Sequence, residues 1–220
     1  MAIFDKFQQL ASVRRTLAES GIQSIHVVMD RVVSATEAIV NGRPLILAGT
    51  NNYLGLTFDP DCIEAACHAA RTQGTGTTGS RAANGSYAVH VQLESEIADF
   101  FGRRGVIVFS TGYVANLGML STLAGPGDVF VIDGDCHASI YDGCRLSGAD
   151  IIRFRHNDAA DLDKRLRRLG GRIENTLIVV EGIYSMLGDR EPQTDSAAVR
   201  RRYPGAFLVG DESHSLGVLG

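Results

Sequence analysis

Short continuous apolar runs recur along the second half of the chain and alternate with helical patterns. Five runs begin 23, 22, 26 and 30 residues apart, and runs without polar interruption are typical of strands buried on both faces. The intervals carry apolar residues at helical spacing, as in Leu162, Leu166 and Leu169. We therefore expect an α/β fold with a mostly parallel sheet flanked by helices. The predicted strands are Val106–Phe109, Val129–Ile132, Ile151–Phe154, Leu177–Val180 and Phe207–Val209.

Three further helices are predicted before this region. The first covers Phe4–Glu19 and the second covers Asp61–Gln73, after Pro60 at a start position that tolerates a missing N–H. A third is indicated by the apolar stripe from Leu93 to Phe100. The glycine-rich stretch Gly74–Ser86 is therefore expected to be a loop between two helices.

The first fifty residues differ in character from the rest of the chain. A turn at Gly42, Arg43 and Pro44 precedes a short apolar run from Leu45 to Ala48. We predict an amino-terminal arm over residues 1–59 and one large α/β domain over residues 60–220.

Composition narrows the classes of function. The 220 residues are 45% hydrophobic and 21% charged, as in a chain that can bury a core. The net charge is -4, so the chain lacks the cationic field that holds a nucleic-acid backbone. We therefore expect no nucleic-acid partner.

The cysteines and the hydropathy pattern bear on location. None of the four cysteines forms a C-x-x-C pair, which favours reduced thiols in a cytoplasmic protein. No stretch approaches the roughly 18 apolar residues of a spanning helix, and we expect neither an export signal nor a membrane anchor. The histidines outside the strand ends stand at no metal-ligand spacing, so no metal site is predicted.

Polar groups follow each predicted strand. In open parallel sheets ligands bind beyond the carboxyl ends of the strands, where loops and helix amino termini converge. We expect these polar groups to share one rim of the sheet. The segments are Ser110–Tyr113, Asp133–His137, Arg155–Asn157, Glu181–Ser185 and Asp211–His214.

The turn at Thr111, Gly112 and Tyr113 joins the first predicted strand to a helix. Such a turn directs backbone amides and a helix dipole at one anion, so a phosphate would fit. An ordinary turn with Ser110 or Thr111 as the helix N-cap accounts for the same residues. From these residues alone the second interpretation is favoured.

Three ionisable residues of the rim are candidates for chemistry. Asp211 ends an apolar run, and a buried aspartate needs a cationic partner, while His214 follows within the same turn. Asp211 could instead cap that turn, with His214 bonded to a backbone carbonyl. His137 opens a predicted helix, where it is either part of a cap or a group that stacks on a ring.

Gly74, Gly76 and Gly79 match the spacing of a dinucleotide-binding fingerprint. That motif requires a strand before its first glycine, but the preceding residues predict a helix. We interpret these glycines as loop residues that permit positive φ or close approach of another subunit. Nicotinamide binding is the disfavoured alternative.

Taken together, seven segments resemble the α-oxoamine synthase family of pyridoxal phosphate (PLP) enzymes, across nearly the whole chain. The resemblance implies fold type I of the PLP-dependent transferases, and it is greatest to the branch that uses L-serine. The segments are NNYLGL (51–56), GTGTTGSRAANGSY (74–87), FSTGYVANLG (109–118), HASIYDG (137–143), RFRHND (153–158), EGIYSMLGD (181–189) and DESHSLGVLG (211–220).

The resemblance implies roles for residues of the rim. His137 would stack on the pyridine ring, Asp211 would pair with the ring nitrogen and His214 would bond the ring hydroxyl oxygen. The phosphate would be held at Thr111, Gly112 and Tyr113, and Ser185 would lie near the ring. Asn51 or Asn52 would orient the carboxylate of the substrate. The predicted catalytic residues are His137, Asp211 and His214.

Two departures from the family pattern limit this transfer. Ser213 stands where the family commonly has alanine beneath the ring. The family's Schiff-base lysine would lie beyond Gly220, and the only lysines here, Lys6 and Lys164, match no such context. We therefore expect a chain truncated before the small carboxy-terminal domain and inactive alone.

The expected activity is condensation of an amino acid, L-serine, with a long-chain acyl-CoA to a 3-keto sphingoid base. The enzyme would be a cytoplasmic homodimer, with peripheral membrane contact for its lipid product. Alternatives within the family are activities of the 8-amino-7-oxononanoate synthase, glycine C-acetyltransferase or aminoketone autoinducer synthase type. A non-catalytic partner subunit that lacks the lysine is the alternative from another class.

Overall fold

The structure, a computed structural model, describes residues 3–20 and 27–219. The chain divides into two compact units, Met1–Thr75 and Gly76–Gly220. These two units do not test the predicted division into an arm over residues 1–59 and a domain over residues 60–220, which stays a prediction.

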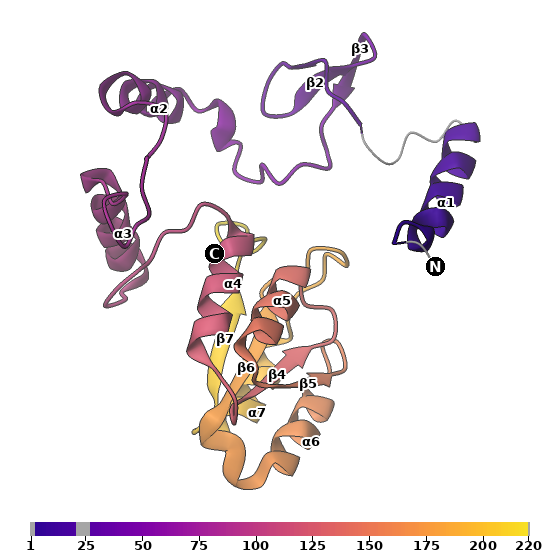
Figure 1. Cartoon of the computed structure of the whole chain (residues 1–220), viewed down its shortest axis with the longest axis vertical. Coiled ribbons are helices and arrows are strands. Elements are labelled where there is room, and N and C mark those ends of the chain that lie inside the picture. The colour runs from indigo at the N-terminus through magenta and orange to yellow at the C-terminus, as the bar shows by residue number, and fades with distance from the viewer. Residues whose placement is uncertain (1–2, 21–26, 220) are drawn as a thin grey trace. The chain divides into compact units, whose positions relative to one another are not determined.

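A four-stranded parallel sheet forms the centre of the second unit (Figure 1). Its order is β5-β4-β6-β7, and every neighbouring pair is parallel. The parallel α/β architecture predicted from the apolar runs is therefore confirmed. The strands are β4 (Val129–Asp133), β5 (Asp150–Phe154), β6 (Thr176–Glu181) and β7 (Phe207–Asp211).

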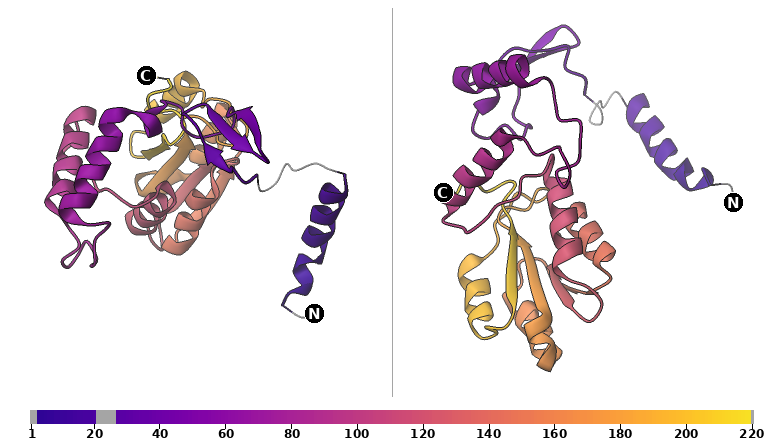
Figure 2. Two further views of the ribbon diagram at one scale, coloured as in Figure 1. Left: turned by 90° about the horizontal axis from the view of Figure 1, so that it is seen from above. Right: turned by 60° about the vertical axis from the view of Figure 1, so that its left-hand side comes forward.

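The two central strands hold the core together. Every residue of β4 and β6 is buried, whereas the edge strands β5 and β7 are partly exposed. Phe130 and Ile132 of β4 pack toward helices α4 (Gly112–Leu123) and α5 (Ala138–Ser147). Val129 and Val131 pack on the other face, toward α6 (Ala159–Leu169) and α7 (Gln193–Arg201). Alternate side chains thus build two cores, and helices flank the sheet on both sides (Figure 2).

The strand predicted over Val106–Phe109 is not formed, so this prediction was wrong. Its backbone groups are bonded by side chains: Val108 N–H donates to Glu94 Oε1 at 2.9 Å, and Arg81 Nη1 donates to Val108 O at 3.4 Å. Glu94 belongs to helix α3 (Ala88–Phe101). An apolar run becomes a strand only where a neighbouring strand pairs with it, and within the described residues none does so here.

The first unit contains two of the predicted helices and, between them in sequence, a small sheet that was not predicted. The Asn41-Gly42 dipeptide has φ of 51° and 71°, the backbone of a tight hairpin turn that joins β2 to β3. No helix of the described residues is long and apolar enough to cross a bilayer. The elements are η1 (Asp5–Phe7), α1 (Gln8–Glu19), β1 (Arg31–Val32), β2 (Glu37–Val40), β3 (Arg43–Ile46), η2 (Leu56–Phe58) and α2 (Pro60–Gln73). In the second unit, η3 (Gly170–Asn175) leads into β6.

Candidate active site

A cavity of about 80 Å³ lies at the carboxyl end of the sheet. It is bounded by the amino terminus of α4, the loop after β4 and the turn after β7. The structure therefore brings five of the predicted site residues together. They are Gly112, Tyr113, His137, Asp211 and His214.

Helix α4 begins at the predicted turn. Thr111 is its N-cap, and Thr111 Oγ1 accepts a hydrogen bond from Val114 N–H at 3.1 Å. The capping interpretation is confirmed for Thr111. The cap leaves room for an anion site at the same helix end. Gly112 and Tyr113 supply the next backbone amides there, and both residues line the cavity.

His137 is the N-cap of α5. Its Nδ1 accepts a hydrogen bond from Ser139 N–H at 3.2 Å and lies 2.7 Å from Ser139 Oγ. The backbone N–H of His137 donates to the buried carboxyl of Glu181. The Tyr113 ring stands edge-on to the imidazole, with centroids 6.5 Å apart. The imidazole is thus held through its Nδ1 side.

Asp211 is half-buried at the end of β7 and accepts three hydrogen bonds. Ser213 donates to Oδ1 through its N–H at 3.0 Å and its Oγ at 2.5 Å, and Asn116 Nδ2 donates to Oδ2 at 2.7 Å. Burial raises the pKa of Asp211, but the bonds from Ser213 and Asn116 outweigh it and bring the pKa below its ordinary value. The group is a carboxylate at neutral pH, and Ser213, the residue that departs from the family pattern, supplies two of its donors.

Three residues of the cavity wall, Asn116, Ser139 and Glu181, were given no role from the sequence, although Glu181 belongs to the predicted rim. Asn116 is 8% exposed and Glu181 is 2% exposed. Burial raises the pKa of Glu181 above its ordinary value, and the nearby Asp211 carboxylate adds to the effect. The sequence signal for Asn116 is a lone amide within a mostly apolar helix, and the signal for Glu181 is a carboxyl that directly follows the apolar run Leu177–Val180.

Three predicted residues are not brought into the cavity, and one is placed beside it. Ser185 N–H bonds to the Glu181 carboxyl while its own side chain is exposed. Asn51 accepts from Tyr53 at 3.3 Å and Asn52 donates to Thr57 Oγ1 at 2.8 Å, both within the first unit. The roles of Ser185, Asn51 and Asn52 stay predictions. Thr111 caps α4 beside the cavity and does not line it.

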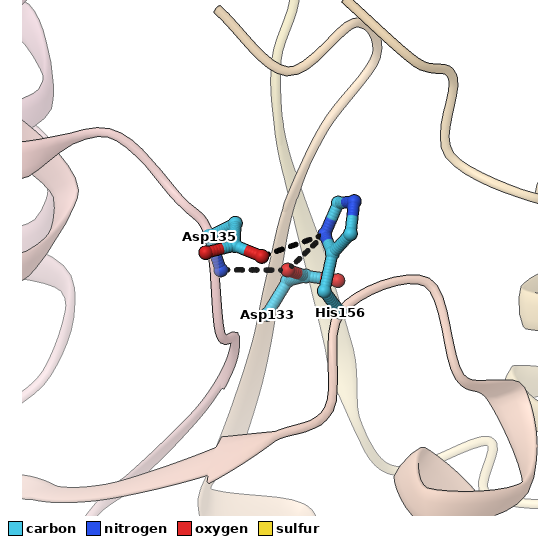
Figure 3. Close-up of side chains that lie close together, drawn as sticks. All are labelled: Asp133, Asp135 and His156. Carbon is cyan, nitrogen blue, oxygen red and sulfur yellow. Dashed lines mark hydrogen bonds and ion pairs between the residues drawn. The ribbon is translucent and has the colours of Figure 1, made fainter. Parts of the chain in front are cut away.

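A third histidine, besides His137 and His214, lies on the same rim. His156, after β5, places Nδ1 2.8 Å from Asp133 Oδ1 and Nε2 2.9 Å from Asp189 Oδ2. Asp135 Oδ2 lies 3.7 Å from Nδ1, and Figure 3 shows the carboxylates of Asp133 and Asp135 converging on the ring. The Tyr184 ring packs edge-on against His156 at 4.4 Å between centroids.

The His156 cluster also has the spacing of a metal site. Donor atoms of Asp133, Asp135 and His156 lie within 4.8 Å of one another. Burial lowers the pKa of His156, but the hydrogen bonds to Asp133 and Asp189 outweigh it and raise the pKa above its ordinary value. A ring with a carboxylate at each nitrogen is an imidazolium, which has no lone pair for a metal. We interpret the cluster as a clamp that ties three rim loops together.

The glycine-rich loop has a local explanation. Helix α2 precedes Gly74, so the strand that a dinucleotide fingerprint needs is absent, as predicted. Gly74 has φ of 86°. A Cβ on Gly79 would lie 1.8 Å from Asn84 Oδ1, and one on Gly85 would lie 1.8 Å from Gly79 O. Gly85 is required by the packing of the loop backbone on itself, whereas a side chain at Gly79 would mainly displace the side chain of Asn84.

Comparison with known proteins identifies relatives of this chain. Residues 43–220 match the family model described as aminotransferase class I and II. Serine palmitoyltransferase from Caulobacter vibrioides is 56% identical over 220 residues, which are 100% of this chain and 54% of the relative. 8-Amino-7-oxononanoate synthase from Geobacter metallireducens is 42% identical over 203 residues, which are 90% of this chain and 51% of the relative.

Solved structures give the same picture. Serine palmitoyltransferase from S. paucimobilis, solved with bound PLP and myriocin, has a TM-score of 0.91 at 48% identity. The match covers 96% of this chain and 53% of that one. The chain therefore spans about half the length of the relatives that it matches.

Proposed function

Because the chain belongs to the aminotransferase class I and II family, we propose that it forms the PLP-binding half of a serine palmitoyltransferase. In the proposed reaction a C–C bond forms between the amino acid Cα and the acyl carbonyl carbon. The C–S bond to CoA breaks, the amino acid carboxyl leaves as CO2 and CoA leaves as the thiol. The observation that carries the proposal is that the charged Asp211 and His137 line one cavity at the end of the sheet.

The residues around Asp211 fit PLP. Its three hydrogen-bond donors are neutral, and no Lys or Arg of the described chain forms an ion pair with it. A half-buried carboxylate without a formal cation favours a cationic ligand group, such as a protonated ring nitrogen. When bound, PLP supplies a ring that accepts electron density from the amino acid Cα. Asp211 would hold the proton on the ring nitrogen and so maintain that capacity.

The other lining residues would orient cofactor and substrate. The amides of Gly112 and Tyr113 would bind the phosphate at the positive end of α4. His137 would stack on the ring, His214 would bond the ring hydroxyl oxygen and Ser185 would lie beside the ring. These roles are carried over from the family resemblance and agree with the lining of the cavity for all but Ser185.

The amine that anchors the PLP aldehyde is the missing component. Lys6 and Lys164 are the chain's only lysines, and neither lines the cavity. We propose that the lysine comes from residues outside these 220, so that this chain alone binds PLP without turnover. A cytoplasmic homodimer, two copies of the whole enzyme, is part of the same proposal.

Equilibrium dialysis tests cofactor binding by the chain. We expect PLP to bind more tightly than pyridoxal, which lacks the phosphate, and Asp211→Asn to weaken PLP by about tenfold or more through loss of a charged partner. Asp150→Asn is the matched control, because Asp150 opens β5 at the opposite end of the sheet. Equal PLP binding by the Asp211 and Asp150 variants would contradict the proposal.

Substrate choice needs a complete enzyme. A chimera that continues this chain with the second half of the Caulobacter relative would be assayed for release of the CoA thiol from palmitoyl-CoA. We expect turnover with L-serine to exceed turnover with L-alanine. The reverse order would favour another condensation of the family, which the 42% identity to an 8-amino-7-oxononanoate synthase keeps as the second candidate. Absence of turnover with intact PLP binding would favour a non-catalytic partner subunit.

A further inference from the structure

A chain of hydrogen bonds, buried at its centre and part-buried at its two ends, joins Asp211 to His137. Asn116 Nδ2 donates to Asp211 Oδ2 at 2.7 Å and to Ser139 Oγ at 3.0 Å, and Ser139 Oγ lies 2.7 Å from His137 Nδ1. Asn116 lies on α4, Ser139 on α5 and Asp211 at the end of β7. Asn116 is 8% exposed and Ser139 is 1% exposed, so the interior bonds are shielded from water.

Close approach of two helices makes the chain possible. Gly143 of α5 faces α4, and a Cβ there would lie 2.8 Å from Asn116 O and 3.0 Å from Leu120 Cβ. Any larger residue would push α5 away from α4. The glycine therefore sets the spacing at which Asn116 reaches Ser139.

The direction of each bond follows from the groups involved. A carboxylate accepts only, so the Asn116 amide must present its NH2 group to Asp211. The second N–H of that group then donates to Ser139 Oγ, which leaves the Ser139 hydroxyl proton to donate to His137 Nδ1. His137 Nδ1 also accepts from Ser139 N–H at 3.2 Å. Nδ1 thus receives two donors, and neutral His137 carries its proton on Nε2.

We propose that Asn116 and Ser139 are positioning residues that hold Asp211 as a carboxylate and fix His137 as the Nε2–H tautomer. Within the described residues Nε2 has no hydrogen-bond partner, so its N–H is available as a donor to an anionic oxygen such as the carboxylate of an amino acid substrate. This last step rests on the proposed function. The tautomer itself does not.

The test is the tautomer of His137 in the full chain without cofactor. Long-range ¹H–¹⁵N spectra of histidine-labelled protein at alkaline pH distinguish the two ring nitrogens, and His137→Gln identifies the signals. We expect the Nε2–H form to dominate, and Ser139→Ala to shift the population measurably toward Nδ1–H. Ser147→Ala is the matched control, because that hydroxyl lies on the same helix and bonds to Cys144 O at 2.6 Å.

Two outcomes overturn the proposal. One is a dominant Nδ1–H form in the unmodified chain, and the other is a tautomer that is the same with and without the Ser139 hydroxyl. Asn116→Asp gives a second approach, since it keeps the shape of the side chain but replaces the NH2 donor with an acceptor facing Asp211. If that variant does not fold, the comparison of Ser139→Ala with Ser147→Ala still tests whether the Ser139 hydroxyl sets the tautomer of His137.

A binding measurement separates this inference from the proposed function. We expect Ser139→Ala to weaken PLP binding several-fold relative to Ser147→Ala in equilibrium dialysis. Unchanged affinity would overturn the claim that the fixed tautomer serves the ligand. If the unmodified chain does not bind PLP but shows the predicted tautomer, the proposed function fails while the positioning roles of Asn116 and Ser139 stand.

Discussion

Two of the three histidines on the rim of the sheet, His137 and His156, are hydrogen-bonded in opposite ways. His137 accepts at Nδ1 from its own helix, and its ring lines the cavity. His156 has a carboxylate at each nitrogen, Asp133 on one side and Asp189 on the other. A ring that receives a ligand keeps one nitrogen available, whereas a ring that holds loops together uses both. The partners of the ring therefore separate a site histidine from a scaffold histidine.

The largest effect is expected from removal of the clamp. His156→Ala leaves the Asp133 carboxylate, which is 1% exposed, without its cationic partner. Loss of one partner of a buried ion pair costs about 2–4 kcal/mol of unfolding free energy. His137→Ala removes a helix cap and should cost only about 1 kcal/mol. Urea denaturation followed by far-ultraviolet circular dichroism measures both.

The same pair of variants can break the comparison. PLP binding should show the opposite order, with His137→Ala losing more affinity than His156→Ala when both are measured at a temperature where each variant is folded. Equal losses of stability and equal losses of PLP affinity would mean that the two rings do not divide the roles as their partners indicate.

The next largest loss of stability is expected when the spacing between α4 and α5 is disturbed. Gly143→Ala introduces a methyl group 2.8 Å from Asn116 O, and overpacking of this kind costs about 1–3 kcal/mol. Gly125→Ala is the control, because a Cβ there meets nothing within 4 Å. We expect the Gly143 variant to be less stable and to share the altered His137 tautomer of Ser139→Ala. If the Gly143 variant is destabilised but its His137 tautomer is unaltered, the spacing between α4 and α5 does not control the hydrogen bonds of Asn116.

Much of the fold could be predicted from the sequence, because buried parallel strands leave continuous apolar runs. Four of the five runs form the sheet, and the predicted fold class, fold type I of the PLP-dependent transferases, is confirmed by the family match and the TM-score of 0.91. Val106–Phe109 failed because strand formation depends on a neighbour that periodicity does not reveal. The β2–β3 hairpin was missed although its Asn-Gly turn is a strong local signal.

The site could be predicted only in part. The ends of β4 and β7 identified His137 and Asp211, since ligands gather at the carboxyl ends of parallel strands. Asn116 was not found, because its role arises from a contact with Asp211 across 95 residues of sequence. The pattern of apolar runs could not distinguish His156 from His137, since both follow strands of the sheet, and only the family resemblance singled out His137. Their bonding partners differ in the structure.

The pH dependence of stability sharpens the contrast between the two rings. The pKa of His156 is raised in the folded chain, so its contribution to stability is fully present below about pH 6.5, where the unfolded chain is also protonated. Above that pH the folded state binds more protons, and stability falls until pH passes the folded pKa. We expect the difference between the unmodified chain and His156→Gln to shrink as pH rises. A difference that grows with pH in urea titrations would contradict the imidazolium assignment.

The smallest effect on PLP affinity is expected from a change at Tyr113, whose ring lies beside His137. Tyr113 OH donates to Asp142 Oδ2 at 2.5 Å, and Arg145 Nη1 donates to Asp142 Oδ1 at 3.0 Å, which together orient the Tyr113 ring edge-on to His137. Tyr113→Phe keeps the ring and loses only this exposed tether, so PLP affinity should fall by no more than about fivefold. The His137 tautomer should not change, because Ser139 sets it. A changed tautomer in Tyr113→Phe would show that the protonation of His137 Nε2 depends on the Tyr113 ring as well as on the hydrogen bonds from Ser139 to Nδ1.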